Sequence, residues 1–323
     1  MRVSIRTTAG RDIGYGHLRR CRTLADALEK HAHAEVTFLV AGRAPVGFVG
    51  DVQSVSAEGL HDLTRREADL MVIDDYAIAE DEIAILRARV SATIAVIDDL
   101  AQRRLAAADV VINPSAGIAE QAYGARTRLV GPAYALLRAP FIDLPARRVN
   151  AGVARVLVTL GGADPRDETA GVLGVVLDAI PDAAIDVLLG PLFGAANVTA
   201  IEEIAHLHPR VSLHRTADVA DLMLAADLAV AAGGQTVFEL AATGLPALAL
   251  AVAENQRNNI ASLSALGTLS ETTRASLAAD VGALASDEAR RRSMAAAGQR
   301  LVDGHGAERV AERLVRARRD RST

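Results

Sequence analysis

Tryptophan is absent from this 323-residue sequence, and cysteine occurs once, as Cys21. A single cysteine excludes an intrachain disulfide and a cysteine-ligated metal cluster. The chain also lacks an excess of basic residues, since its net charge is −5 and its sequence pI is about 5.9. This charge disfavours nonspecific binding to nucleic acid. The segment Met1–Thr8 has no long apolar run, so we expect no signal peptide and a cytoplasmic protein.

Uninterrupted apolar runs of membrane-spanning length are also lacking. The most apolar stretch, 222–253, contains polar residues such as Asp227 and Glu239 and is broken by Gly244 and Pro246. A spanning helix needs about 20 mostly apolar residues without such interruptions. We therefore expect a buried strand, helix and strand here, and no stable membrane insertion.

Half of the residues are hydrophobic, and they occur as short apolar runs that alternate with helical patterns. Near-continuous apolar strands followed by helices are typical of parallel sheets covered on both faces. The series is interrupted around 139–152, which has the composition of a linker. We therefore expect an α/β protein with two Rossmann-like domains facing a cleft, at 1–145 and 146–323. The expected strands are Arg2–Thr7, Val36–Val40, Leu70–Asp74, Thr93–Asp98, Val110–Asn113, Val156–Leu160, Ile185–Leu189, Val211–Leu213, Leu228–Ala231 and Ala247–Ala251. The expected helices are His17–Lys30, Glu80–Val90, Glu168–Ala179, Val219–Ala225, Thr236–Thr243, Asn258–Ala265 and a charged tail from Ser286.

A glycine-rich segment, 10–17, joins the first strand to the first helix and contains Gly14, Gly16 and His17. Glycines allow a tight turn and close approach of a ligand to the backbone. The positive end of the helix dipole would keep an imidazole at His17 neutral, as a general base requires. The alternative is a plain glycine turn with His17 as a cap or surface residue.

The second half has two glycine pairs after strands. Gly161-Gly162 precedes Asp164 and is either a ligand-facing turn or a strand-to-helix turn capped by Asp164. The other pair opens Gly233-Gly234-Gln235-Thr236, with Glu239 one helical turn later. Its N–H groups suit phosphate and Glu239 suits ribose hydroxyls, although a tight turn with Glu239 on a solvated face is the alternative.

Polar residues also follow other strands. Asn255 and Gln256 carry amides that can read sugar hydroxyls and acetamido groups, or they belong to an ordinary loop. The acidic pairs Asp74-Asp75 and Asp98-Asp99 have no histidine at metal-ligand spacing. We therefore expect hydrogen-bonded cap roles for them, with no metal and no cofactor.

Several motifs, taken in order, resemble the UDP-2,4-diacetamido-2,4,6-trideoxy-β-L-altropyranose hydrolase family (PseG) of pseudaminic acid biosynthesis. The first is Gly14-Tyr15-Gly16-His17-Leu18-Arg19-Arg20-Cys21, similar to the signature Gly-x-Gly-His-x-x-Arg-Cys. The others are 72–76, 96–101, 131–138, 160–165, 232–239, 244–246 and 254–256. Together they extend over about residues 2 to 265.

The resemblance implies a glycosyltransferase-B architecture similar to that of MurG, with water as the acceptor. It implies that the second domain holds UDP, that His17 is the catalytic histidine, that Tyr76 lies near the reacting centre and that Asn255 lies near the sugar. The full set of predicted substrate-binding residues is Gly14, Gly16, Arg20, Gly161, Gly162, Gly233, Gly234, Gln235, Thr236, Glu239, Asn255 and Gln256.

The resulting prediction is a hydrolase that cleaves the anomeric C–O bond of a UDP-activated diacetamido-trideoxy sugar with inversion and releases UDP. A glycosyltransferase on the same scaffold is the alternative, and a non-catalytic sugar-nucleotide-binding subunit is a third possibility. Only a small-molecule partner is expected, and a monomer is compatible with the sequence. The identity of the sugar stays open.

Overall fold

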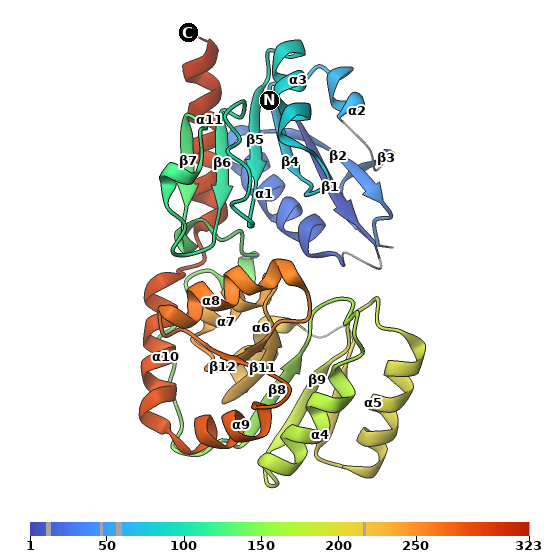
Figure 1. Ribbon diagram of the computed structural model, residues 1–323, viewed down its shortest axis with the longest axis vertical. Helices are drawn as coiled ribbons and strands as arrows, with labels where there is room; N and C mark the ends of the chain where they lie inside the picture. Colours follow the sequence, from blue (N-terminus) through green and yellow to red (C-terminus); the bar gives the residue numbers. More distant parts are fainter. Residues whose placement is uncertain (11–13, 46–47, 56–59, 216–217, 323) are drawn as a thin grey trace. The chain divides into compact units, whose positions relative to one another are not determined.

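The computed structural model describes residues 1–10, 14–45, 48–55, 60–215 and 218–322, without the side chains at 255 and 322. Its contacts divide the chain into two compact units. The first unit consists of Met1–Arg138 together with Gly304–Thr323, and the second of Ala139–Asp303. Each unit is built around its own parallel sheet (Figure 1).

The first unit contains a seven-stranded parallel sheet in the order β3-β2-β1-β4-β5-β6-β7. Every residue of β4, β5 and β6 is buried, as expected for strands covered on both faces. The strands are β1 (Arg2–Ala9), β2 (Glu35–Gly42), β3 (Asp51–Val55), β4 (Leu70–Asp74), β5 (Thr93–Ile97), β6 (Val110–Asn113) and β7 (Thr127–Val130). The helices are α1 (Gly16–Ala32), α2 (His61–Thr64), α3 (Glu80–Arg89) and α11 (Gly306–Ser322), with short 3₁₀ turns η1 (Glu120–Ala122) and η2 (Pro132–Tyr134).

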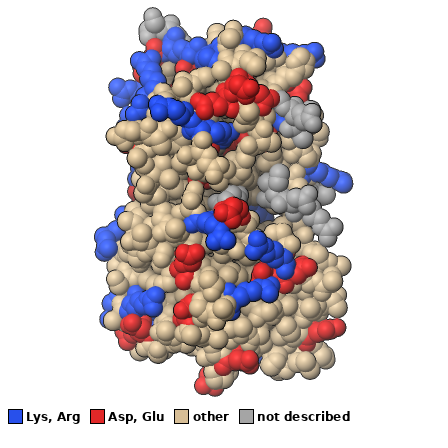
Figure 2. Space-filling model, viewed as in Figure 1, with Lys and Arg blue, Asp and Glu red and all other residues tan. Residues whose placement is uncertain are grey.

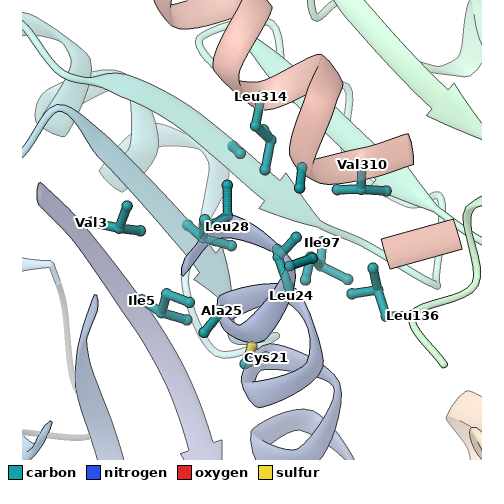
Figure 3. Close-up of a cluster of buried hydrophobic side chains, with 14 of the residues drawn as sticks. Val3, Ile5, Cys21, Leu24, Ala25, Leu28, Ile97, Leu136, Val310 and Leu314 are labelled. Atoms are coloured by element: carbon teal, nitrogen blue, oxygen red, sulfur yellow. The ribbon is translucent and has the colours of Figure 1, made fainter. Parts of the chain in front are cut away.

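Alternate residues of these strands form two hydrophobic cores, one on each face of the sheet. On one face, strand residues such as Ile5 and Ile97 pack with α1 and α11. On the other face, Ile73 and Val96 pack with Leu86 of α3 and with α2. The side chains in Figure 3 belong to the first of these cores, to which α1, α11 and the strands β1, β2, β4, β5, β6 and β7 contribute.

The C-terminal helix α11 belongs to the first unit, which corrects the expected range 146–323 for the second domain. Val310 and Leu314 of α11 are fully buried against the core that contains Leu28 of α1 (Figure 3). The many charged residues of this tail made it look solvent-exposed in the sequence. Its apolar residues instead cover one face of the first sheet. The other domain boundary lies at 138/139 rather than at the expected 145.

Gly306 provides a test of how α11 is docked. A β-carbon at Gly306 would lie 2.1 Å from the backbone oxygen of Ala135, whereas one at Gly282 of α9 (Leu277–Ser286) would meet nothing within 4 Å. We expect Gly306→Ala to lower the free energy of unfolding of the first unit by about 1–3 kcal/mol. Gly282→Ala, the matched control, should be neutral or stabilising. Urea denaturation of both variants measures this, and equal stabilities would contradict the docking.

The second unit has a six-stranded parallel sheet in the order β10-β9-β8-β11-β12-β13. Helices α4, α5 and α9 contribute to a core on one face. The strands are β8 (Arg155–Thr159), β9 (Ala184–Leu188), β10 (Val211–His214), β11 (Leu228–Ala232), β12 (Ala247–Leu250) and β13 (Ser270–Thr272). The other helices are α4 (Thr169–Ala179), α5 (Ala195–Leu207), α6 (Val219–Ala225), α7 (Thr236–Thr243), α8 (Arg257–Ala265) and α10 (Glu288–Leu301), with η3 (Ala139–Phe141) and η4 (Glu254–Gln256).

The expected α/β class with two Rossmann-like domains is confirmed, and every expected strand is present. The expected series omitted β3, β7 and β13. All three are edge strands with partly exposed residues, and such strands lack the continuous apolar run that predicts a central strand. Helices α5 and α9 were omitted as well.

The expected linker, 139–152, packs against the second unit through hydrogen bonds of Arg147. Its guanidinium donates to the backbone oxygens of Met223, Ala226 and Thr243.

The apolar stretch 222–253 folds as part of α6 followed by β11, α7 and β12, as expected. No helix in the described part of the chain is long and apolar enough to cross a membrane. Acidic and basic side chains are interspersed over the face in Figure 2.

Both units reverse their strand order beside their first strand. The neighbours of β1 are β2 and β4, and the neighbours of β8 are β9 and β11. Chain crossovers leave in opposite directions at such a point, so the loops at the carboxyl ends of the two strands separate and leave room for a ligand. The segments after β1, β4, β8 and β11 are therefore the places where each unit is expected to bind a ligand.

Candidate functional site

His17 lies at the reversal point of the first unit, as the second residue of α1. The turn before it is closed by backbone hydrogen bonds between Gly10 and Gly14, and Gly14 has φ +80°, a conformation that favours glycine. Residues 11–13 of the predicted glycine segment lie outside the described residues. The expected position of His17 in the first helical turn is confirmed.

Asp74, the last residue of β4, contacts the imidazole of His17. Nδ1 of His17 lies 2.7 Å from Oδ1 of Asp74. The same carboxylate accepts two hydrogen bonds from Arg20, from Nε to Oδ2 at 2.7 Å and from Nη2 to Oδ1 at 2.5 Å. The thiol of Cys21 lies 3.4 Å from Oδ2. The Asp74 carboxylate is fully buried. All of these contacts come from residues in the first two turns of α1.

Arg20 also reaches the next strand. Its Nη1 donates to Oδ2 of Asp99, just after β5, at 2.5 Å, and the hydroxyl of Tyr76 donates to the same oxygen. Tyr76 in turn packs edge-on against His17, with ring centroids 4.7 Å apart and an interplanar angle of 81°. Both predicted catalytic residues are therefore brought together, and Arg20 links their carboxylate partners.

The buried groups of this cluster shift one another's pKa values. Burial would raise the pKa of Asp74, but Arg20 and His17 outweigh it and hold that pKa well below its usual range. Burial would likewise lower the pKa of Arg20, but Asp74 and Asp99 outweigh it and raise that pKa. Burial, followed by the charge of Asp99, raises the pKa of Tyr76, which keeps the phenol protonated.

Arg20 was predicted to bind substrate, and in the structure each of its three guanidinium nitrogens donates to a protein carboxylate. Its side chain is 4% exposed, and Nε, Nη1 and Nη2 all contact Asp74 or Asp99. Bidentate arginine–carboxylate pairs fix geometry, so Arg20 orders the side chains around it. Oδ1 of Asp99 is a buried acceptor to which no described residue donates a hydrogen bond.

Asp75 and Asp98, the other members of the two acidic pairs, have the hydrogen-bonded roles that the sequence predicted. Asp75 accepts from the backbone N–H of Ala77 and from the buried guanidinium of Arg6. Asp98 accepts from the backbone N–H of Ala101 and from Arg103 and Tyr123. Among the described residues, no group of three or more His, Cys, Asp or Glu side chains is arranged to hold a metal ion.

In the second unit, the turn after β8 is held by Asp164. Its carboxylate accepts from the backbone N–H groups of Glu168 and Thr169 and from the side chain of Asn197. The cap role considered for Asp164 is confirmed. Gly161 has φ +88°, and the carbonyls of the predicted pair Gly161-Gly162 lie so close to Gly190 that a β-carbon there would clash at 2.4 Å.

The turn after β11 is tied to the segment after β12. Oε1 of Gln256 accepts from the backbone N–H of Gly233 at 3.2 Å and from that of Val252 at 3.1 Å. Gln256 therefore positions this turn, and the N–H of Gly233 has a protein partner. A β-carbon at Gly234, in contrast, would meet nothing within 4 Å, so the backbone is open at this position.

Gly234 lies two residues before Thr236, the first residue of α7. No side-chain hydrogen bond caps this helix at Gln235, and partly buried Glu239 lies in the first turn. Open backbone next to a helix N-terminus suits an anion. Asn255 lies in η4, but its side chain is outside the described part of the structure.

Sequence reasoning missed the roles of Asp74 and Asp99 at the site. Both were noted as acidic residues at strand ends, but without a histidine nearby in sequence. The available signal was topological: β1, β4 and β5 are adjacent in the sheet, so residues at their carboxyl ends meet.

Comparison with curated proteins gives two relatives, and no family model matches the chain. The chain is 25% identical to the spore coat polysaccharide biosynthesis protein SpsG of Bacillus subtilis, with 96% of each chain covered. It is 27% identical over 276 residues to an uncharacterized protein of Methanocaldococcus jannaschii. That match covers 80% of this chain and 57% of the archaeal relative, so the chain spans little more than half of that protein's length.

Solved structures share the fold. MurG of Acinetobacter baumannii matches with a TM-score of 0.64 and 15% identity over 98% of this chain and 100% of the MurG chain. The UDP-GlcNAc 2-epimerase of Neisseria meningitidis, bound to UDP-GlcNAc, matches with a TM-score of 0.64 and 13% identity over the same shares. The two parallel-sheet units therefore have the glycosyltransferase-B fold. The closer resemblance to the pseudaminic acid hydrolases remains a prediction.

Proposed function

We propose that this chain is an enzyme that hydrolyses a UDP-activated sugar, with His17 as the general base. The observation that carries the proposal is the edge-on contact of His17 with Tyr76 at the reversal point of the first sheet. The two residues implied by the hydrolase resemblance are 59 positions apart in sequence and lie together in the fold. The relative SpsG, named for polysaccharide biosynthesis, supports a role in sugar metabolism.

The proposed reaction is a single displacement at the anomeric carbon. His17 removes a proton from water, and the water oxygen attacks that carbon on the face opposite UDP. The bond between the anomeric carbon and the phosphate oxygen breaks, which yields UDP and a free sugar of inverted configuration. UDP is a good leaving group, so an oriented water and a base are the main requirements. Tyr76, beside the imidazole, is proposed to orient the water or the sugar.

The second unit is proposed to bind the UDP moiety. The open backbone at Gly234 and the first turn of α7 would hold the diphosphate, and Glu239 would accept hydrogen bonds from the ribose. Among proteins of the same fold, the N. meningitidis epimerase is bound to UDP-GlcNAc, and the MnaA protein of S. aureus is described with UDP. This supports a UDP-sugar as the ligand class.

Turnover of a panel of UDP-sugars in ¹⁸O-water tests the proposal. The panel includes a UDP-diacetamido-trideoxy sugar, and mass spectrometry identifies the products. We expect free sugar labelled at its anomeric oxygen and unlabelled UDP. Label in UDP would place the attack at phosphorus and refute the mechanism. The His17→Ala protein, purified identically, controls for contaminating hydrolases.

A glycosyltransferase is the second candidate, favoured by the likeness to MurG and to the glycotransferase of kitacinnamycin, which matches with a TM-score of 0.65. The same panel separates the two functions. Turnover that requires an added acceptor would identify a transferase, and an epimeric UDP-sugar formed without release of UDP would identify an epimerase.

Turnover is expected to persist in excess EDTA. The oxygens of Asp74 are taken by Arg20 and His17, and Asp75 and Asp98 are held by arginines and backbone N–H groups. The N-terminus of α7 is instead available to stabilise the leaving diphosphate. Rates with and without EDTA measure this. Loss of activity that magnesium or manganese restores would contradict it.

A further inference from the structure

We propose that Asp74 is a positioning residue that keeps the proton of the His17 imidazole on Nδ1, and that Arg20 holds Asp74 for this task. The inference deepens the proposed function and rests on it for its catalytic meaning. It assigns a role to a buried carboxylate that the sequence predicted only to cap its own loop.

The proton position follows from the contacts of the Asp74 carboxylate. Asp74 is fully buried, and Arg20 forms two hydrogen bonds with it. The guanidinium outweighs burial and lowers the pKa of Asp74, so the carboxylate is ionised at neutral pH and can only accept hydrogen bonds. At 2.7 Å from this acceptor, Nδ1 of His17 must carry a proton.

Arg20, a second neighbour of Nδ1, does not change the conclusion that Nδ1 carries the proton. Nη2 of Arg20 lies 3.3 Å from Nδ1, and a guanidinium can only donate. An unprotonated Nδ1 facing Arg20 would also turn its lone pair toward the Asp74 oxygen 2.7 Å away, and two acceptors repel each other at that distance. With Nδ1 protonated, the neutral ring has its lone pair on Nε2. Nε2 is therefore the atom that would take the proton from water.

Arg20 makes the arrangement rigid. It lies one turn after His17 on α1, and its planar fork matches the carboxylate of Asp74 in two places. Its third nitrogen, Nη1, donates to Asp99, which also accepts from the hydroxyl of Tyr76, and the ring of Tyr76 packs edge-on against the imidazole. Ring orientation and proton position are therefore set by one buried network.

Asp74→Asn removes the charge and keeps the shape. Nε of Arg20 and the thiol of Cys21 point at the Oδ2 position, and Nη2 of Arg20 points at Oδ1. Nη2 also lies 3.3 Å from Nδ1 of His17 and can donate to it when Nδ1 is unprotonated, so the carboxamide oxygen is expected at Oδ2 and the NH₂ group toward His17. An NH₂ group donates to Nδ1 and moves the ring proton to Nε2, where it blocks the base. We expect kcat to fall roughly 10²-fold with a smaller change in KM.

The experiment is ¹⁵N NMR of histidine-labelled protein, with His17 assigned by difference from His17→Ala. We expect the neutral ring of His17 to be protonated at Nδ1 in the wild type and largely at Nε2 in Asp74→Asn. Asp99→Asn is the matched control, because it removes a carboxylate from the same network without touching His17, and it should keep the proton on Nδ1.

A wild-type ring protonated at Nε2 would overturn the proposal even if Asp74→Asn does not fold. So would an unchanged proton position and kcat in Asp74→Asn, or an equal shift in Asp99→Asn, which would point to net charge instead of contact. Failure of the proposed function is distinguishable, because a protein that hydrolyses no UDP-sugar still reports its ring proton by NMR.

Discussion

Replacing His17 with alanine is expected to lower kcat by roughly 10²–10⁴-fold, the usual contribution of a general base. The imidazole lies at the reversal point of the first sheet, in contact with Asp74 and Tyr76, and α1 begins one residue earlier. Removing it leaves the attacking water without a base. Steady-state kinetics with the UDP-sugar identified by the panel measures the loss.

Two comparisons make this result specific. UDP binding, measured by calorimetry, should be unchanged in His17→Ala, because UDP is assigned to the second unit. His206→Ala, which removes an exposed histidine from α5, should retain wild-type turnover. A His17→Ala enzyme within a fewfold of the wild-type kcat would remove His17 from the mechanism.

Replacing Glu239 with alanine is expected to weaken UDP binding by about 1–3 kcal/mol, or roughly 5- to 150-fold in Kd. Glu239 lies in the first turn of α7, next to the open backbone at Gly234. Its carboxylate would accept charge-assisted hydrogen bonds from the ribose hydroxyls. Isothermal titration with UDP measures the change, and no metal needs to be added.

Glu254→Ala is the matched control for this variant. Glu254 is an exposed carboxylate of the same unit, paired with Arg257 in an i,i+3 contact. Its removal should leave the Kd for UDP within about twofold, since exposed pairs contribute little. Unchanged affinity in Glu239→Ala would reject the ribose assignment, and an equal loss in both variants would indicate a general effect of charge.

Much of the fold follows from local patterns in the sequence. Strands such as β4, β5 and β11 are buried on both faces, so each appears as an uninterrupted apolar run with a glycine or an acidic residue near its end. The edge strand β3 has only exposed and partly buried residues and gives no such signal. Helix α11 could be predicted as a helix, but its unit could not, because its core partners are more than 150 positions away in sequence.

The sequence by itself determined two parallel α/β units, the glycine turns at their strand ends and the place of His17 at the start of a helix. These are local properties, set by hydrophobic runs and by the backbone freedom of glycine. Only the tertiary structure decided which side chains gather around His17. Asp74 and Tyr76 contact it, and Asp99 joins through Arg20 and Tyr76, because β1, β4 and β5 are adjacent in the sheet. Strand order depends on contacts between distant residues, and no local pattern specifies it.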